Sequence, residues 1–167
     1  MGVALRAARP GVEHALWSVH TRAIRISAAT HYTEDALEAW AGRMRPEHYI
    51  EPMRTRAMIV AEATTDAARV AGFGQLQPEE GVIEAIYVDP DFARRGIGRG
   101  LFEALENLAR ARGLPGLTVE ASLNSVPFYA AMGCVRRCVD RHELAPGVHI
   151  ACVVMDKHLT PTPGATP

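Results

Sequence analysis

The sequence predicts a single α/β domain, in which a mixed, mostly antiparallel sheet of about seven strands is flanked by about four helices. The size and composition are one reason, because 167 residues, 48% apolar and 22% charged, are typical of one folded domain. The order of patterns is another, since strand-like and helical segments follow one another as βααβββαβαββ. No repeat or linker-like stretch interrupts residues 1–158, and a Pro- and Thr-rich tail at 159–167 is expected to be disordered.

A strand at Val3–Ala8 and two helices are expected in the N-terminal part of the chain. The first helix begins near Pro10, a residue that suits a helix start. Its buried face is a stripe of apolar residues at helical spacing: Val12, Leu16, Val19, Ala23 and Ile26. The second helix begins at Thr33, and the acidic residues that follow suit the positive first turn of a helix.

Three strands and then a long helix are expected in the middle of the chain. The strands are Ala57–Ala63, Val70–Gln77 and Val82–Val88. Turn-rich segments join them, so we expect an antiparallel meander. After Pro90, apolar residues recur at helical spacing: Ile97, Leu101, Phe102, Leu105, Leu108 and Ala109. Gly113 and Pro115 end this helix.

The C-terminal part is expected to hold a strand, a short helix and two closing strands. The strand covers Leu117–Ala121, and the helix runs from Ser125 to Met132, where Gly133 stops it. The closing strands lie around residues 134–142 and 149–157.

Composition and charge exclude several classes of function. Eighteen basic and nineteen acidic side chains give a net charge of −1, so no nucleic-acid partner is expected. The longest apolar run, Ile150–Met155, is strand-sized, and Arg6 and Arg9 interrupt the N-terminus before a signal peptide could form, so no membrane partner is expected. Three cysteines without C-x-x-C spacing suit a reducing compartment. We therefore expect a cytoplasmic protein, and a homodimer stays open.

A glycine-rich turn between a strand and the long helix is the most informative segment. It contains Gly96, Gly98 and Gly100, interleaved with Arg94, Arg95 and Arg99. Glycines let backbone amides approach a ligand closely, and the positive end of the helix dipole adds to the charge of the arginines. The segment therefore predicts a local site for a phosphate-containing ligand. The alternative is an ordinary turn with solvated arginines.

Two common nucleotide-binding motifs do not fit this turn. A dinucleotide fingerprint that starts at Gly96 would need glycine at Leu101, and one that starts at Gly98 would need it at Glu103. A P-loop needs Gly-Lys-Ser/Thr, which the sequence lacks. The phosphate compound is therefore expected to be of another kind.

Three segments carry a resemblance to a known family over nearly the whole chain. They are Tyr87–Pro90, Arg95–Leu101 and Asn124–Cys134. Together they resemble the GNAT superfamily of acetyl-CoA-dependent N-acetyltransferases. The resemblance implies a sheet that is splayed in the middle, with acetyl-CoA as the acyl donor. The sequence departs from the family at Ala93, where Gln or Arg is usual, and at Cys134, where Phe is usual.

The resemblance also implies which residues contact acetyl-CoA and which residue protonates its sulfur. The contacts fall on Ile86, Tyr87, Val88, Arg94, Arg95, Gly96, Ile97, Gly98, Arg99, Gly100, Asn124 and Phe128. Tyr129 matches the tyrosine that stands near the sulfur, and a phenol can donate a proton to a leaving thiolate. The alternative role for Tyr129 is packing of the short helix.

Glu84 is the candidate for the acceptor side of the reaction. Strict alternation along the strand would place its side chain on the same face as Ile86 and Val88. The family often has an acidic residue near this position that deprotonates the incoming amine. Glu84 is therefore a candidate catalytic base, with an ammonium anchor or a solvated strand charge as the alternatives.

The acceptor amine is expected to contact the first two helices and their joining loop. His31, Tyr32 and Trp40 are candidates there, although a core or capping role suits such residues as well. The amine is a small molecule or a peptide. Cys134, Cys138 and His142 recur every four residues, but in a strand this spacing only places them on one face, so no metal site is expected.

The expected function is transfer of an acetyl group from acetyl-CoA to a primary amine, by direct attack in a ternary complex. Two alternatives stay open. One is a non-catalytic module that binds acetyl-CoA as a sensor or structural ligand. The other is a protein that uses the same turn to bind ATP or NAD.

Overall fold

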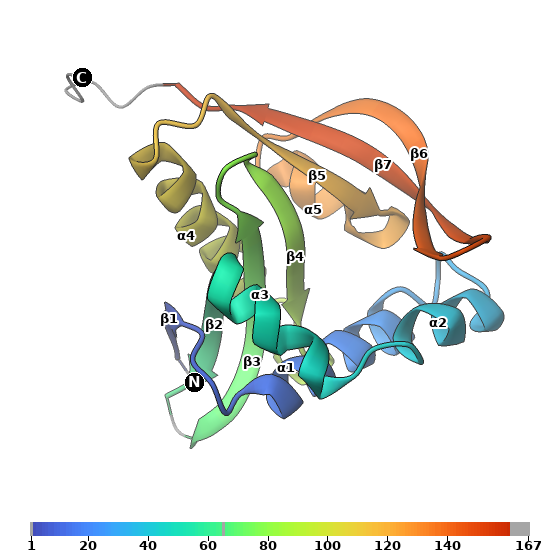
Figure 1. Cartoon of the computed structure of the whole chain (residues 1–167), viewed down its shortest axis with the longest axis horizontal. Coiled ribbons are helices and arrows are strands. Elements are labelled where there is room, and N and C mark those ends of the chain that lie inside the picture. The colour runs from blue at the N-terminus through green and yellow to red at the C-terminus, as the bar shows by residue number, and fades with distance from the viewer. Residues whose placement is uncertain (1, 65, 161–167) are drawn as a thin grey trace.

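In the computed structural model, which describes residues 2–64 and 66–160, seven strands form one mixed sheet in the order β1-β2-β3-β4-β5-β7-β6 (Figure 1). The strands are β1 (Val3–Ala7), β2 (Ala57–Ala63), β3 (Asp66–Gln77), β4 (Val82–Val88), β5 (Gly116–Ser122), β6 (Val135–Ala145) and β7 (Val148–His158). All neighbours are antiparallel except β4 and β5. The predicted α/β class and the meander of β2, β3 and β4 are therefore confirmed.

Five α-helices accompany the sheet in the described residues, where about four were expected. They are α1 (Glu13–Arg22), α2 (Glu34–Ala41), α3 (Ile50–Thr55), α4 (Ile97–Ala111) and α5 (Val126–Ala131). The unpredicted helix is α3, which follows a 3-10 turn at Pro46–Tyr49. It has six residues and buries none of them, so it leaves no apolar stripe in the sequence.

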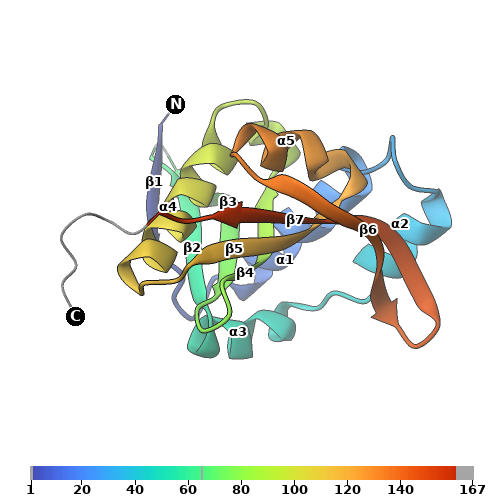
Figure 2. The same ribbon diagram turned by 90° about the horizontal axis from the view of Figure 1, so that it is seen from above.

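Strand β3 shows how the helices are distributed over the two faces of the sheet (Figures 1 and 2). Gly72 and Gly74 face α4, where a Cβ atom on Gly74 would lie 3.0 Å from Leu105. Phe73, between them, packs against Leu16 of α1 on the opposite face. The two glycines therefore let α4 approach the sheet closely, while the larger side chain fills the space under α1.

The predicted apolar stripe of the first helix is wrong at its last position. A π-helical turn (Ala23–Ser27) follows α1, and a π-turn places residues at a different angle from an α-helix. As a result Ile24 is buried, at 1% exposure, whereas Ile26 is 54% exposed.

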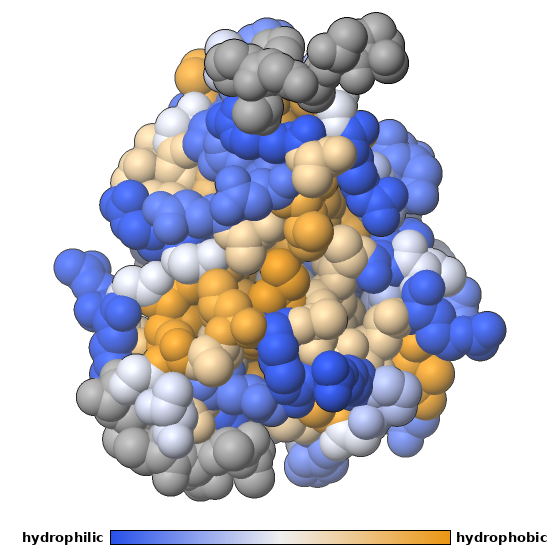
Figure 3. All heavy atoms as spheres, turned by 90° about the vertical axis from the view of Figure 1, so that its left-hand side faces the viewer, coloured by the Kyte–Doolittle hydropathy of each residue, from blue (hydrophilic) through white to orange (hydrophobic). Residues whose placement is uncertain are grey.

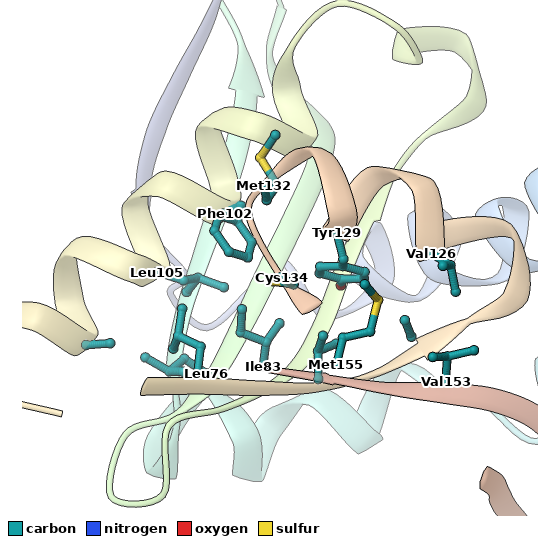
Figure 4. Packing of buried hydrophobic residues seen from close by; sticks show 14 of the residues in the cluster. Leu76, Ile83, Phe102, Leu105, Val126, Tyr129, Met132, Cys134, Val153 and Met155 are labelled. Carbon is teal, nitrogen blue, oxygen red and sulfur yellow. The ribbon is translucent and has the colours of Figure 1, made fainter. Parts of the chain in front are cut away.

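The C-terminal boundary of the domain lies beyond the predicted one. Leu159 is 2% exposed, packs in the main core cluster, and donates its backbone N–H to the carbonyl of Pro115 at 2.9 Å. The core cluster around it joins α4 and α5 to the sheet (Figure 4). Leu159 is thus part of the folded domain, and the rest of the predicted tail, residues 161–167, lies outside the described residues.

The edge of the sheet that β1 forms carries an apolar groove between β1, β2 and α4. Leu5, Met53 and Leu108 are among the residues that line it. Figure 3 shows this side of the molecule, where apolar side chains gather between hydrophilic ones.

Nowhere in the described part of the chain does a helix combine the length and apolarity that a bilayer crossing requires.

The sheet opens between its two halves. β4 and β5 pair only at Val82 with Thr118 and at Ile83 with Val119. The pairing of β3 with β4 shifts there, because Gln75 faces Ala85 while Leu76 faces Ile83. Glu84 is therefore the extra residue of a β-bulge, which bends a strand and increases its twist. The predicted splay of the sheet is confirmed, and Figure 1 shows β4 and β5 together at one end and apart at the other.

The π-helical turn predicts different costs for two neighbouring isoleucines. We expect Ile24→Ala to lower the free energy of unfolding by about 2–5 kcal/mol, because it removes a fully buried side chain. Ile26→Ala is the matched control and should cost less than about 0.5 kcal/mol, because that side chain is exposed. Chemical denaturation measures both, and equal costs would contradict the π-turn.

Candidate active site

A cleft of about 1220 Å³ fills the opening between β4 and β5. One wall comes from β4 and the turn before α4, and the other from β5, β6, β7 and α5. Helix α1, the π-helical turn after it and α2 close one end, with His20, Ile24 and Trp40 among the lining residues. The cleft therefore joins the glycine-rich turn to the region where the sequence predicts the acceptor.

The N-terminus of α4 presents free backbone amides to the cleft. Gly96 is the N-cap and has a φ of +79°, a left-handed conformation that glycine adopts without strain. The first intrahelical bond runs from the N–H of Gly100 to the carbonyl of Gly96, at 3.0 Å. The amides of Ile97, Gly98 and Arg99 precede that bond, so they have no partner within the helix. Unpaired amides at the positive end of a helix dipole can bind an anion.

The three arginines of this turn have different surroundings. Arg94 and Arg99 line the cleft. Arg95 instead lies over the ring of Phe92, with its guanidinium carbon 5.6 Å from the ring centroid. Of the predicted phosphate-binding side chains, the structure thus brings Arg94 and Arg99 to the site and places Arg95 in a cation–π contact beside it.

Asp89 anchors the turn, and the sequence analysis did not assign it a role. Asp89 is 6% exposed, and its carboxylate accepts two hydrogen bonds from Arg22, at 3.1 and 3.3 Å. It also accepts one from the N–H of Asp91 at 2.9 Å. A buried carboxylate needs such partners. Asp89 therefore fixes the start of the turn to α1, and Arg22 lies too far away in the sequence to signal this contact.

The backbone of β4 offers hydrogen-bonding groups to the cleft at two of the three predicted positions. The N–H of Asp89 bonds to the carbonyl of Ala71, at 2.9 Å. Backbone groups alternate in direction along an antiparallel ladder, so Tyr87, two residues earlier, also turns its N–H and C=O toward β3. Ile86 and Val88 turn theirs the other way, into the opening beyond Ile83. The backbone N–H of Tyr87 thus faces β3 and not the cleft, although the resemblance implied a contact with acetyl-CoA at this residue.

The segment before α5 supplies an unpaired acceptor and an apolar wall. The side-chain oxygen Oδ1 of Asn124 is buried and lacks a hydrogen-bond partner within the described residues. The ring of Phe128 lies close to Gly98, where a Cβ atom would be 3.3 Å from it. Both residues line the cleft. A ligand with an N–H group would satisfy Asn124, and only glycine at position 98 leaves room beside Phe128.

Tyr129 lies on α5 beneath the cleft and packs against Phe102 and Phe128. Figure 4 shows its ring within the core cluster, between Cys134 and Val126. The residue is 4% exposed, yet it belongs to the cleft lining. Burial, with a smaller contribution from Tyr87, raises the pKa of this phenol far above its ordinary value. The hydroxyl therefore stays protonated and can donate a hydrogen bond.

Glu84 lies on the face opposite to the predicted one, because of the bulge. Ile83 and Ile86 both pack with the cluster under α4 and α5, so the alternation is broken between them. The carboxylate oxygen Oε2 of Glu84 accepts hydrogen bonds from Arg56 at 2.9 Å and from Gln75 at 2.6 Å. Glu84 still lines the cleft, now from the side of α1 and α3.

The three predicted acceptor residues have separate roles in the fold. The hydroxyl of Tyr32 donates to the carbonyl of Ala151 at 2.7 Å and accepts from the N–H of Leu123 at 2.8 Å. His31 is exposed and contacts Thr30. Trp40 is buried, packs edge-on against Tyr32 and lines the cleft. Only Trp40 therefore combines a structural role with a place at the acceptor end.

Two further groups that no sequence pattern indicated also line the cleft. The first is a pair in which Nδ1 of His142 and a carboxylate oxygen of Glu120 lie 2.6 Å apart. The second is His20, whose Nδ1 lies 2.8 Å from the hydroxyl of Tyr49 and whose Nε2 is buried without a partner in the described residues. The sequence separation of each pair is large, so no local pattern could have indicated them.

No group of three or more His, Cys, Asp or Glu side chains in residues 2–64 and 66–160 is arranged to hold a metal ion. Cys134 is buried and Cys138 is exposed. A register shift in β6 between Arg136 and Cys138 reverses the alternation, so Cys134 lies on the core face while Cys138 and His142 lie on the other, and the three do not share one face as predicted.

Residues 28–150 match the family model of the acetyltransferase (GNAT) domain. The match covers well over half of the chain, and the splayed sheet and the glycine-rich turn agree with it. The chain belongs to the GNAT acetyltransferase family. It is an acetyltransferase that takes its acetyl group from acetyl-CoA.

Individual relatives support this membership. An uncharacterized N-acetyltransferase of Escherichia coli, YafP, is 28% identical over 131 residues, which are 78% of this chain and 80% of that protein. The crystal structure of a GCN5-related N-acetyltransferase from Rhodopseudomonas palustris superposes with a TM-score of 0.86 at 29% identity, over 95% of this chain and 97% of the other. PaiA N-acetyltransferase from Thermoplasma acidophilum, solved in complex with coenzyme A, shares the fold with a TM-score of 0.78 at 19% identity, over 95% and 100% of the two chains.

His20 predicts a specific loss of stability in acid. Burial lowers its pKa to about 3, whereas an unfolded chain has an ordinary histidine. As the pH falls below about 6.5, the unfolded state gains a proton that the native state does not, so stability is lost progressively down to about pH 3. Between pH 7 and pH 5 we expect His20 to account for about 2 kcal/mol of this loss.

Two variants test this assignment by denaturation at pH 7 and pH 5. His20→Gln should remove most of the His20 contribution, so its stability changes less with pH. His14→Gln is the matched control, because His14 lies on the same helix but is exposed. An identical pH dependence for wild type and His20→Gln would show that His20 is not the responsible group.

Proposed function

We propose that the protein acetylates a primary amine by direct attack of the amine on acetyl-CoA in a ternary complex. One observation carries this proposal: the opening beyond Ile83 and Val119 runs from the free amides of α4 to the acceptor end near Trp40. Two ligands can therefore enter the same cleft from opposite ends. No covalent protein intermediate is needed, because the amine and the thioester can meet within the opening.

The residues present fit acetyl-CoA. The amides of Ile97, Gly98 and Arg99, with Arg94 beside them, supply donors for its phosphate groups. The backbone groups of Ile86 and Val88 that face the opening suit its amide-containing arm, as an added strand would be bound. Asn124 supplies a buried acceptor for an N–H group. Acetyl-CoA contributes a reactive thioester, and these residues hold it in one orientation.

Tyr129 is the proposed proton donor to the sulfur that leaves. Its hydroxyl stays protonated because burial raises its pKa, and its place in the cleft lining lets it reach a ligand. A hydrogen bond from this hydroxyl would stabilise the charge that develops on sulfur. Packing against Phe102 and Phe128 holds the ring in place, so its packing and catalytic roles are compatible.

Glu84 is the proposed anchor for the ammonium group of the acceptor. Two donors, Arg56 and Gln75, already occupy its Oε2 atom. Its other oxygen can still accept a hydrogen bond from an ammonium group. We assign the amine-binding role to Glu84 and leave proton removal to another group.

The acceptor is proposed to be a small-molecule or peptide amine. The acceptor end combines the apolar surfaces of Ile24 and Trp40 with the carboxylates of Glu84 and Glu120. This combination suits an ammonium group carried on a partly apolar body. We further propose that the reaction takes place in the cytoplasm, which the three free cysteines support.

Turnover with a panel of amines tests the proposed function. We expect coenzyme A to be released, as detected by a thiol-reactive dye, only when acetyl-CoA and a suitable primary amine are both present. Tight binding of acetyl-CoA with no release for any amine would favour the alternative, a non-catalytic sensor of acetyl-CoA.

Ligand specificity is tested by thermal shift. Acetyl-CoA and coenzyme A should raise the melting temperature, by an amount that corresponds to about 2.7 kcal/mol at a hundred times Kd. ATP and NAD should give smaller shifts at the same concentration, because the turn lacks both nucleotide motifs. A larger shift with ATP or NAD would contradict the coenzyme assignment.

Tyr129→Phe tests the proton donor. We expect kcat to fall by about 10²–10⁴-fold, while the melting temperature and the affinity for coenzyme A stay unchanged. Tyr49→Phe is the matched control, since it removes a buried phenol hydroxyl that contacts His20. A Tyr129→Phe enzyme with full activity would exclude the hydroxyl from proton transfer.

A further inference from the structure

A carboxylate–imidazole pair lies at the point where β4 and β5 separate. Val119 is the last residue of β5 that pairs with β4, and Glu120 follows it directly. Val119 and Ala121 face the core under α5, so Glu120 faces the other side of the sheet. Its carboxylate lies 2.6 Å from Nδ1 of His142, which projects from β6. Both side chains are about half exposed, and both line the cleft.

The strand between the two residues permits this contact. β7 lies between β5 and β6, and it places Cys152 opposite Ser122 on one side and Asp140 on the other. Cys152 is a small side chain that is 1% exposed, so it leaves space above it for larger neighbours. Burial, followed by the charge of Glu120, raises the pKa of the Cys152 thiol. The thiol is therefore neutral and does not compete for protons.

The hydrogen bond fixes the tautomer of His142. An ionised carboxylate has no proton to donate, so Nδ1 of His142 must carry the hydrogen. In the neutral imidazole Nε2 then has a free lone pair and acts as a proton acceptor. The carboxylate also stabilises the imidazolium that forms when Nε2 takes up a proton. A proton-accepting nitrogen with a built-in counter-charge is the arrangement that a general base requires.

The other charged and titratable groups around His142 are less suited to accept a proton from the amine. Those that line the cleft with it are Glu84 and Tyr87 from β4, Glu120 from β5, Glu143 from β6, Cys152 from β7, His20 from α1, Arg43 from the turn after α2, Arg94 from the turn before α4, Arg99 from the start of α4, and Tyr129 from α5. Asp140 lies two residues from it on β6. Glu84 is bound to Arg56 and Gln75. His20 has a pKa of about 3 and so accepts protons poorly.

We propose that His142 is the general base of the reaction and that Glu120 is its positioning residue. This proposal rests on the proposed acetyl transfer to an amine. Nε2 of His142 accepts one proton from the ammonium group, and the freed lone pair of the amine forms the new C–N bond with the carbonyl carbon. The C–S bond breaks, its electron pair stays on sulfur, and the thiolate takes a proton from Tyr129. The nitrogen loses a second proton as the amide forms. One of the two protons that leave nitrogen restores the Tyr129 hydroxyl and the other is released to water, so Tyr129 and His142 both return to their starting forms.

The location of the pair supports this assignment. Ile83 and Val119 are the last paired residues of β4 and β5, and Glu84 and Glu120 follow them directly in the sequence. Both carboxylates therefore stand at the point where the two strands separate. Glu84 faces the same side as Glu120, because both avoid the core under α4 and α5. An ammonium group held by Glu84 is therefore brought to the side of the sheet on which His142 lies.

Three variants test the proposal through the pH dependence of kcat/KM with an amine that the wild type acetylates. His142→Gln should lower kcat/KM at neutral pH by about 10²–10⁴-fold and remove the acidic limb of the profile. Glu120→Gln should cause a smaller loss of kcat/KM, because Nδ1–H of His142 then donates to a neutral amide instead of a carboxylate. Glu120→Asp, which keeps the carboxylate, should restore part of this loss.

A matched control lies on the same hairpin. His149 stands 3.9 Å from Glu143, a similar surface pair that is outside the cleft lining at its imidazole end. His149→Gln should leave both the rate and the acidic limb unchanged. If His142→Gln behaves like His149→Gln, the proposal is wrong and the pair is an ordinary surface contact. A rise in KM with unchanged kcat and an unchanged limb would also overturn it, since it would indicate binding alone.

Chemical rescue gives a second readout. His142→Ala leaves a half-exposed space, so added imidazole should increase its rate in proportion to concentration. The same addition should not increase the rate of Tyr129→Phe. Absence of rescue together with an unchanged limb in His142→Gln would exclude the base role. If the wild type itself acetylates no amine, the proposed function fails and the base assignment fails with it, whereas an active wild type with unaffected variants overturns only the base.

Discussion

The separation of β4 from β5 is the constraint on which the rest of the site depends. β4 and β5 are parallel and pair only at Val82 and Ile83 of β4. If the pairing continued along both strands, no opening would remain in the sheet. The bulge at Glu84 bends β4 and ends that pairing. Backbone groups of Ile86 and Val88 are then left without a neighbouring strand, which is costly unless water or a ligand binds them. The bulge thus converts part of a sheet into a binding surface.

The same bulge determines which side chains face each end of the cleft. It turns Glu84 away from the core and places it level with Glu120 on the neighbouring strand. The other end is lined by the amides of α4 and the guanidinium groups of Arg94 and Arg99. One end therefore favours anions and the other favours cations. Phosphates and an ammonium group would be drawn to opposite ends of one cleft.

Contacts outside the cleft hold these two ends in place. Asp89 ties the turn before α4 to Arg22 of α1, and Gly72 and Gly74 let α4 lie close to β3. On the other side, the hydroxyl of Tyr32 bridges β7 and the segment after β5. Each of these residues orients a part of the site without being part of the proposed chemistry. The rigidity of the scaffold is what allows a half-open sheet to keep its shape.

The sequence by itself determined the class of fold, the positions of the strands along the chain, the long helix and the glycine-rich turn before it, because each follows from local periodicity or from glycines next to a helix start. It also indicated Tyr129, Asn124 and Phe128 through their resemblance to a family. Tertiary structure alone decided the side on which Glu84 lies, the place of Ile26, the burial of Leu159 and the pairing of Glu120 with His142. A strict period of 2 in a strand or 3.6 in a helix predicts which face each side chain lies on. A bulge and a π-turn change that face, and contacts between distant strands add neighbours, without leaving a local pattern in the sequence.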